Sequence, residues 1–110
     1  MLNFDALATG SGVEVFGDED ITAIVSAIGS DIDVDVAVAV TRGLRDSTSD
    51  FASFREAGVP YMMFSGDDAS RIHSESDTIE FVQPEMLGGA AAAAAELLQS
   101  KEFATWIGNR

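Results

Sequence analysis

The sequence predicts an α/β fold, a three-layer α/β/α arrangement around a mixed, mostly parallel sheet. The expected elements alternate short strands with helices, which is the order typical of such layers. Residues 32–40 alternate valine with aspartate and then become apolar on both faces, as in a strand that enters a sheet covered on both sides. A chain of 110 residues with no internal repeat or linker fits one compact domain, over residues 1–110.

Short elements are expected in the first half of the chain. Residues 1–8 open with alternating apolar and polar residues, which indicates a strand that carries Asp5 near its end. A glycine-serine turn at 9–12 leads to a second strand at 13–16. Apolar residues then recur at helical spacing over 21–28, which predicts an amphipathic helix.

The second half continues the same alternation. A short helix over 50–57 ends at a glycine, and a buried strand follows at 60–64. Residues 65–80 are expected to form a long polar loop. A last helix begins at Pro84 and is followed by an apolar turn. Its apolar side is expected to comprise Leu87, Ala90, Ala91, Ala94, Leu97 and Leu98.

The charge balance is strongly acidic, with 19 Asp and Glu against 6 Lys and Arg and a formal net charge of -13. Nucleic acids and anionic membranes are therefore not expected as partners, because both require a cationic surface. Two interpretations of the acidity remain open: an ordinary solvated acidic surface, or the halophilic adaptation of a protein to molar salt.

The chain has no cysteine, which excludes disulfides and thiolate chemistry. No cationic segment precedes an apolar stretch at the N-terminus, and no apolar run is long enough to span a bilayer. A cytoplasmic location is expected, although a truncated N-terminus would hide a signal.

Only a few residues stand out chemically. His73 is the single histidine, and a lone loop histidine is more often solvated than a ligand. Asp5 is unusual because aspartate is depleted in strands, although an exposed place at the strand end would explain it. A Gly-x-Ser-x-Gly elbow is absent, as are phosphate-binding glycine motifs, so serine-hydrolase and nucleotide-binding interpretations are not favoured.

Three stretches together resemble one family. Residues 2–5 read Leu-Asn-Phe-Asp, residues 49–54 read Ser-Asp-Phe-Ala-Ser-Phe before Ala-Gly-Val-Pro at 57–60, and Phe-Ser-Gly at 64–66 precedes a His-Ser-x-x-Asp-Thr segment at 73–78. In this order and spacing they resemble the di-zinc aminopeptidases, the family of secreted bacterial leucyl aminopeptidases that is related to glutaminyl cyclases. The resemblance implies a zinc-peptidase-like fold, of which this chain is a partial, C-terminal portion.

The resemblance also implies roles for individual residues. Asp5 would be a ligand of one zinc ion and His73 a ligand of the other, in a pair bridged by an aspartate and a water. In the family that water attacks the N-terminal peptide bond while a glutamate acts as the general base. Asp50 and Asp77 would support the ligands through hydrogen bonds. An alternative is that Asp50 caps a helix and Asp77 caps a loop.

Several positions of the chain depart from the family pattern. Three of the family's five ligand positions and its general base precede the Leu-Asn-Phe-Asp strand, so no catalytic residue is expected within this chain. Ile72 stands where relatives often have an oxyanion-stabilising tyrosine, and Thr48 where some have a substrate-contacting arginine. Phe51 replaces a common histidine.

These observations predict the metal-ligand-bearing portion of a zinc-dependent hydrolase of peptide substrates, inactive as an isolated chain. A mixed Asp and His site could also take manganese or cobalt. The alternative from another class is a non-catalytic structural or interaction domain that retains the peptidase fold. Assembly as a homo-oligomer, or with a complementary chain that supplies the missing half, is a further expectation.

Overall fold

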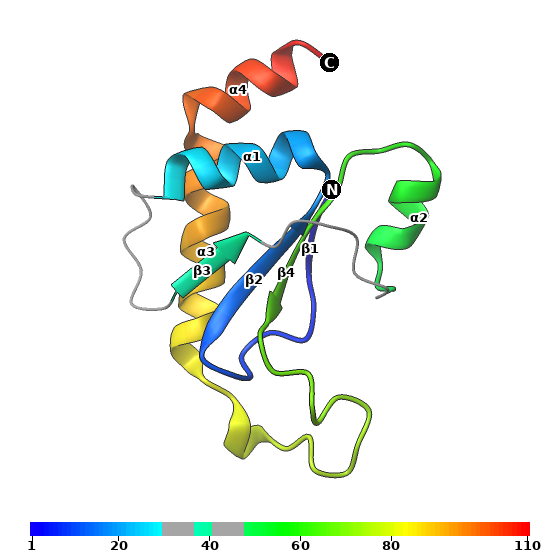
Figure 1. Ribbon diagram of the computed structural model, residues 1–110, viewed down its shortest axis with the longest axis vertical. Coiled ribbons are helices and arrows are strands. Elements are labelled where there is room, and N and C mark those ends of the chain that lie inside the picture. Colours follow the sequence, from blue (N-terminus) through cyan, green and yellow to red (C-terminus); the bar gives the residue numbers. More distant parts are fainter. Residues whose placement is uncertain (30–36, 41–47) are drawn as a thin grey trace.

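Among the residues that the structure describes, four strands form a single sheet in the order β1-β4-β2-β3. The computed structural model describes residues 1–29, 37–40 and 48–110 (Figure 1). In chain order the elements are β1 (Leu2–Phe4), β2 (Gly12–Gly17), α1 (Glu19–Ile28), β3 (Ala37–Val40), α2 (Phe51–Glu56), β4 (Met62–Gly66), the 3-10 helix η2 (Ile79–Phe81), α3 (Pro84–Gln99) and α4 (Lys101–Gly108).

The predicted order of strands and helices is confirmed. Of the strand predicted over 32–40, the final four residues are β3, whereas residues 30–36 and 41–47 lie outside the described residues. The loop predicted over 65–80 is shorter at both ends, because β4 continues to Gly66 and η2 begins at Ile79.

The pairing of the strands confirms a mixed, mostly parallel sheet. β1 runs parallel to β4 and β2 runs parallel to β3, while the central pair β2 and β4 is antiparallel. The register places Phe64 of β4 between Phe4 of β1 and Val15 of β2. Since β1 and β4 are parallel, their carboxyl ends lie at the same edge of the sheet.

The larger core covers one face of this sheet. Alternate side chains of β2 and β4 point toward α1 and α3, because successive residues of a strand face opposite sides. The buried residues of this cluster are Val13, Val15, Ile21, Val25, Ile28, Met62, Phe64, Met86, Ala90, Ala93, Ala94 and Leu97. Phe64 is fully buried at its centre and stacks on Phe4, with ring centroids 4.8 Å apart.

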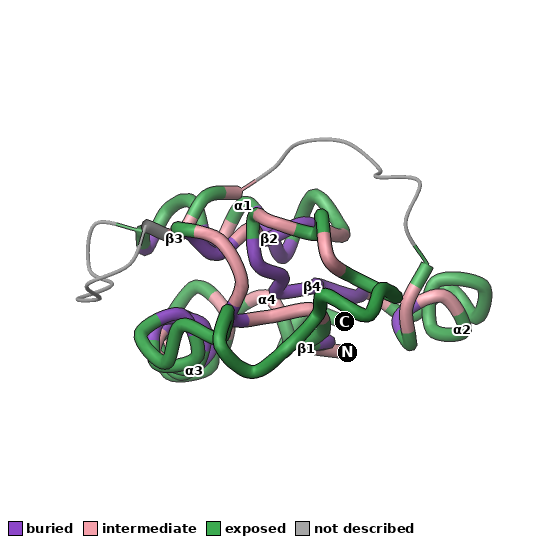
Figure 2. The backbone as a smooth tube through the Cα atoms, turned by 90° about the horizontal axis from the view of Figure 1, so that it is seen from below, coloured by how far each residue is buried: buried purple, intermediate pink, exposed green. Residues whose placement is uncertain are grey.

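A smaller core covers the other face. It joins Phe51 of α2 to Phe16, Tyr61 and Met63, which alternate with the residues of the larger core. Figure 2 shows α2 on the side of the strands opposite α3, so the predicted three layers are confirmed. The Phe51 ring stacks on Tyr61 at 4.7 Å and meets Phe16 edge-on at 5.9 Å.

The apolar side predicted for α3 is partly wrong. Leu87 and Leu98 are 46% and 53% exposed, and Ala91 is also exposed. The helix is rotated so that Met86 fills the core, while the small residues Gly89 and Ala93 face the packed side. Helical periodicity gives the width of an apolar stripe, but the fit of side-chain volumes decides which edge of it is buried.

The apolar turn expected after α3 is a separate helix. Ser100 ends α3 and begins α4, where its Oγ accepts a hydrogen bond from the Phe103 backbone N–H at 3.1 Å. Phe103 and Trp106 pack against the larger core. Across the three described ranges, no helix is long and apolar enough to cross a membrane.

Candidate functional site

The candidate site lies at the edge where β1 and β4 both end. The Asp5 backbone N–H donates to the Phe64 carbonyl at 3.2 Å, and the Gly66 N–H donates to the Ala6 carbonyl at 3.0 Å. The segments that leave the two strands therefore run side by side beyond the sheet. One carries Asp5, and the other forms the loop to His73, which extends past the strands in Figure 1.

Asp5 is exposed, and a chain of hydrogen bonds holds its carboxylate. Ser49 Oγ donates to Asp5 Oδ2 at 2.6 Å, and Asn3 Nδ2 donates to Ser49 Oγ at 2.8 Å. Within the described part of the chain, Oδ1 of Asp5 has no hydrogen-bond partner. The arrangement leaves one carboxylate oxygen available to a cation.

Ser49 is a residue of the site that the sequence pattern does not predict. It lies just before α2, 44 positions after Asp5. The only signal in the sequence is its place in the Ser-Asp motif ahead of a helix. The contact with Asp5 depends on how α2 packs on the sheet.

His73 lies in the loop between β4 and η2 and is exposed. Its backbone has φ of 60°, in the left-handed region that is uncommon for residues other than glycine. Such conformations persist where surrounding contacts hold them, and they are found more often at functional sites. No hydrogen bond to the imidazole is found among the described residues, so the exposed side chain is available to a ligand.

Asp5 and His73 belong to segments that leave the same sheet edge, but no hydrogen bond or ion pair connects them. In residues 1–29, 37–40 and 48–110, no group of three or more His, Cys, Asp or Glu side chains could hold a metal ion. Each residue could therefore offer a single ligand, and the described residues do not complete a metal centre.

Among the described residues, no hydrogen bond or ion pair joins the side chain of Asp50 or Asp77 to Asp5 or His73. Asp50 precedes α2 in a helical conformation, and its side chain makes no capping hydrogen bond. Asp77 is exposed, and its backbone N–H donates to the Ser74 carbonyl at 3.2 Å. Their supporting role stays a prediction.

The three departures from the family pattern differ in their surroundings. Thr48 is exposed, and Ile72 is 42% exposed on the loop that carries His73. Phe51, by contrast, is 1% exposed at the centre of the smaller core. The packing of its ring explains an apolar residue at this position.

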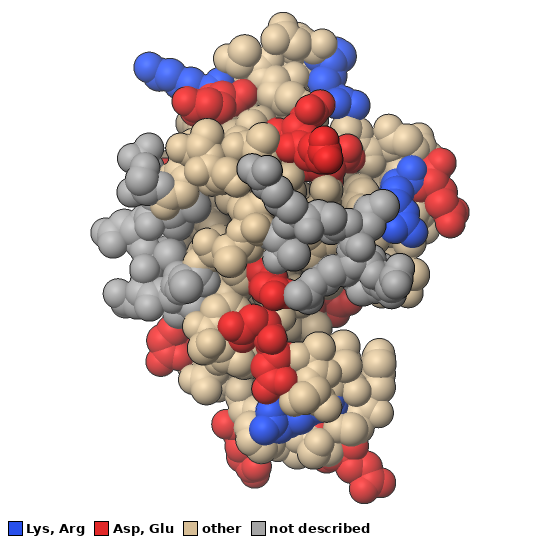
Figure 3. Space-filling model, in the orientation of Figure 1, with Lys and Arg blue, Asp and Glu red and all other residues tan. Residues whose placement is uncertain are grey.

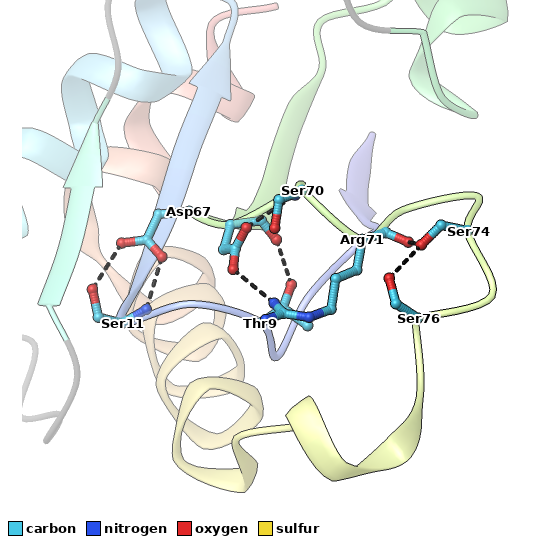
Figure 4. A network of polar contacts seen from close by, with 8 residues as sticks. Thr9, Ser11, Asp67, Ser70, Arg71, Ser74 and Ser76 are labelled. Atoms are coloured by element: carbon cyan, nitrogen blue, oxygen red, sulfur yellow. Dashed lines mark hydrogen bonds and ion pairs between the residues drawn. The ribbon is translucent and has the colours of Figure 1, made fainter.

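A polar network fixes the loops on which the site is built (Figure 4). Ser11 donates to Asp67 twice, from its backbone N–H to Oδ1 at 2.8 Å and from Oγ to Oδ2 at 3.1 Å. Thr9 Oγ1 donates to the Asp68 carbonyl at 2.7 Å, and Arg71 pairs with the Asp68 carboxylate at 3.1 Å. The segment after β1 is thereby joined to the segment after β4.

Hydrogen bonding lowers the pKa of both carboxyl groups in this network. The pKa of Asp67 lies below its ordinary value chiefly because the Ser11 backbone N–H donates to the ionised form. The pKa of Asp68 is lowered by hydrogen bonds from Ser70 and by the charge of Arg71. Both groups therefore favour the ionised, loop-joining state.

The lowered pKa of Asp67 predicts a pH-dependent contribution to stability. Its folded-state pKa lies below the unfolded value of about 3.9, so the stabilisation is present above that value and lost as pH falls through the folded pKa. In denaturant unfolding, the difference in the free energy of unfolding between wild type and Asp67→Asn should become smaller as the pH falls below about 5. Ser11→Ala keeps the backbone donor, so it should keep most of this pH dependence. Wild-type and Asp67→Asn curves that stay parallel down to about pH 2 would contradict the assignment.

Comparison with known protein families gives a match over most of the chain. The model of peptidase family M28 matches residues 1–98. No curated protein and no solved structure matches the chain. Because the matched region extends over both candidate ligands and all four strands, this chain belongs to peptidase family M28.

Proposed function

We propose that this chain is the C-terminal, metal-ligand-bearing portion of a zinc-dependent aminopeptidase-like hydrolase. Asp5 is a ligand of one zinc ion and His73 a ligand of the other. The observation that carries the proposal is the Asp5 carboxylate, which is exposed at the sheet edge with Oδ2 held by Ser49 and Oδ1 open. Membership of peptidase family M28 supports the hydrolase class.

The donor chemistry of both residues fits zinc. Carboxylate oxygen and imidazole nitrogen are among its common ligands, and a catalytic zinc takes about three of them from the protein. The described residues supply one for each ion, so the remaining ligands come from outside this set. A bound zinc would supply Lewis-acid polarisation of a water or a carbonyl. The role of Asp5 and His73 is to hold the metal.

The same reasoning leads us to propose that the isolated chain does not hydrolyse peptides, which are its substrates only when the centre is complete. A homo-oligomer, or a complementary chain, is the partner that we propose for this chain. The second candidate function is a non-catalytic interaction domain that retains the fold. Two residues favour it. Phe51 is buried in the smaller core where the family resemblance implies a histidine, and Ile72 stands where it implies a tyrosine.

The charge distribution argues against a nucleic-acid or anionic-membrane partner. On the face shown in Figure 3, acidic side chains occur in several separate groups, and the basic side chains form no continuous patch among the residues drawn in colour. Electrostatic binding to phosphates requires such a patch. A cytoplasmic location and a peptide substrate are part of the proposal.

Zinc titration by calorimetry in high salt tests the proposal. We expect binding that both Asp5→Ala and His73→Ala weaken by at least about tenfold, because each removes a direct ligand. Glu102→Ala, which removes an exposed carboxylate from α4, is the matched control and should leave the affinity unchanged.

Turnover of an aminoacyl-anilide in the same zinc-loaded samples is expected to be absent. Binding that is indifferent to both ligand substitutions would overturn the assignment of the ligands. Zinc-dependent turnover by the pure chain would instead overturn the proposed inactivity, and would leave the ligand assignment in place.

A further inference from the structure

Asn3 is a buried polar residue in the middle of β1. It is 5% exposed and lies in register with Met63 of β4. Asparagine is depleted in strands, and a valine at a buried strand position would suit both propensity and packing. The amide therefore needs a specific reason to be there.

The hydrogen bonds of Asn3 supply that reason. Its Nδ2 donates to Ser49 Oγ at 2.8 Å and approaches the sulfur of Met63, a weak acceptor, at 3.6 Å. The contact with Ser49 joins residues that are 46 positions apart, and Ser49 in turn donates to Asp5. The three side chains form one continuous line from the interior to the candidate site.

The chemistry of the three side chains fixes which group donates and which accepts in each hydrogen bond. An ionised carboxylate only accepts hydrogen bonds, so the single hydrogen of the Ser49 hydroxyl must point to Asp5 at 2.6 Å. The Ser49 oxygen is then free only to accept, and the group that faces it, Asn3 Nδ2, can only donate. Neither hydrogen bond can reverse while Asp5 is ionised.

We propose that Asn3 is a positioning residue for Asp5 that acts through Ser49. By keeping the Ser49 hydroxyl aimed at Oδ2, Asn3 holds the Asp5 side chain in one rotamer with Oδ1 turned to the outside. The effect of this order on zinc affinity rests on the proposed function of Asp5, whereas the order itself does not. A carboxylate ordered in advance loses less conformational freedom when a cation binds.

The metal-free protein provides the first test. The χ1 rotamer of Asp5, measured from NMR side-chain couplings, should be single in wild type and averaged in Asn3→Leu, which keeps the shape of asparagine but not its donor. Ser49→Ala should give the same averaging of the Asp5 χ1 rotamer. Ser49→Thr, which keeps a hydroxyl, should retain a single rotamer. Asn109→Leu, at the exposed C-terminal end of α4, is the matched control and should change nothing.

Zinc affinity gives a second readout, which a purely structural role of Asn3 would not reproduce. Asn3→Leu and Ser49→Ala should each weaken binding about tenfold, in the range observed when groups that orient a ligand are removed. The double variant should be no weaker than Ser49→Ala, because residues that act through one another are not additive.

Separate results decide the two proposals. An Asp5 side chain that stays in one rotamer in folded Asn3→Leu overturns the positioning role, as does an additive loss of affinity in the double variant. If Asn3→Leu does not fold, Asn3→Val removes the same donor with a better strand former. Affinity that does not change in Asp5→Ala overturns the proposed function, and the rotamer measurement still decides the role of Asn3.

Discussion

Replacing Phe51 with alanine is expected to lower the free energy of unfolding by about 3–5 kcal/mol, the usual cost of removing a buried aromatic side chain. Phe51 is 1% exposed and fills the centre of the smaller core, where it stacks on Tyr61 and meets Phe16. The truncation removes both ring contacts and leaves a cavity between α2 and the sheet. Denaturant unfolding followed by circular dichroism measures the change.

A matched control lies on the same helix. Phe54 is 41% exposed, so Phe54→Ala should cost less than about 1 kcal/mol. Equal losses for the two phenylalanines would contradict the view that the smaller core holds α2 on the sheet. Phe51→His, which introduces the residue that the family resemblance implies at this position, should also destabilise the fold, because an imidazole in this apolar cluster is desolvated.

The expected effect of Phe51→Ala reaches the candidate site. Phe51 is the first residue of α2, two positions after Ser49, which donates to Asp5. A loosened α2 would release Ser49 from both Asn3 and Asp5. The packing of Phe51 and the geometry of the predicted ligand Asp5 are thus linked through one short helix.

The sequence predicts most of the elements, because their periodicities are local, but not η2 or the separate helix α4. Alternation predicted the strands, and the helical spacing of apolar residues predicted α1 and α3. The buried edge of α3 was not predictable in this way, since it depends on how Met86, Gly89 and Ala93 fit against the sheet. Ser100, which separates α3 from α4, belongs to the residue types that favour the N-cap of a helix, and its side chain caps α4.

The candidate site was only half predictable. The strand pattern placed Asp5 near the end of its strand, but its partner Ser49 is 44 residues away, and only packing brings the two together. The conformation of the loops was harder to predict, because Ala6 and Ala8 adopt φ of 50° and 74°, values that are uncommon for alanine. The carboxylate of Asp67 holds these loops together without belonging to any of the matched motifs.

Replacing Gly66 with alanine is expected to destabilise the protein by about 2–3 kcal/mol, as an overpacked site does. A Cβ on Gly66 would lie 2.4 Å from the Thr9 carbonyl oxygen and 3.1 Å from that of Ala6. Both are backbone atoms, which cannot rotate away as a flexible side chain would. Unfolding in denaturant at neutral pH measures the loss.

Gly88 offers a control with the opposite sign. It lies inside α3, and a Cβ there would meet nothing within 4 Å. Gly88→Ala should therefore stabilise the protein by about 0.5–1 kcal/mol, because alanine is the better helix former. Similar effects of the two glycine substitutions would show that chain entropy, rather than close approach at the sheet edge, decides the outcome.

Gly66→Ala should also weaken zinc binding, although Gly66 has no side chain to offer a ligand. Its N–H donates to Ala6 next to Asp5, and Thr9 is joined to Asp68 on the other segment, so the two segments move apart only if these bonds break. If the added methyl group separates them, zinc affinity should fall together with stability. If Gly66→Ala loses stability but binds zinc as wild type does, Asp5 is oriented by Ser49 and Asn3 alone, independently of the contacts between the two segments.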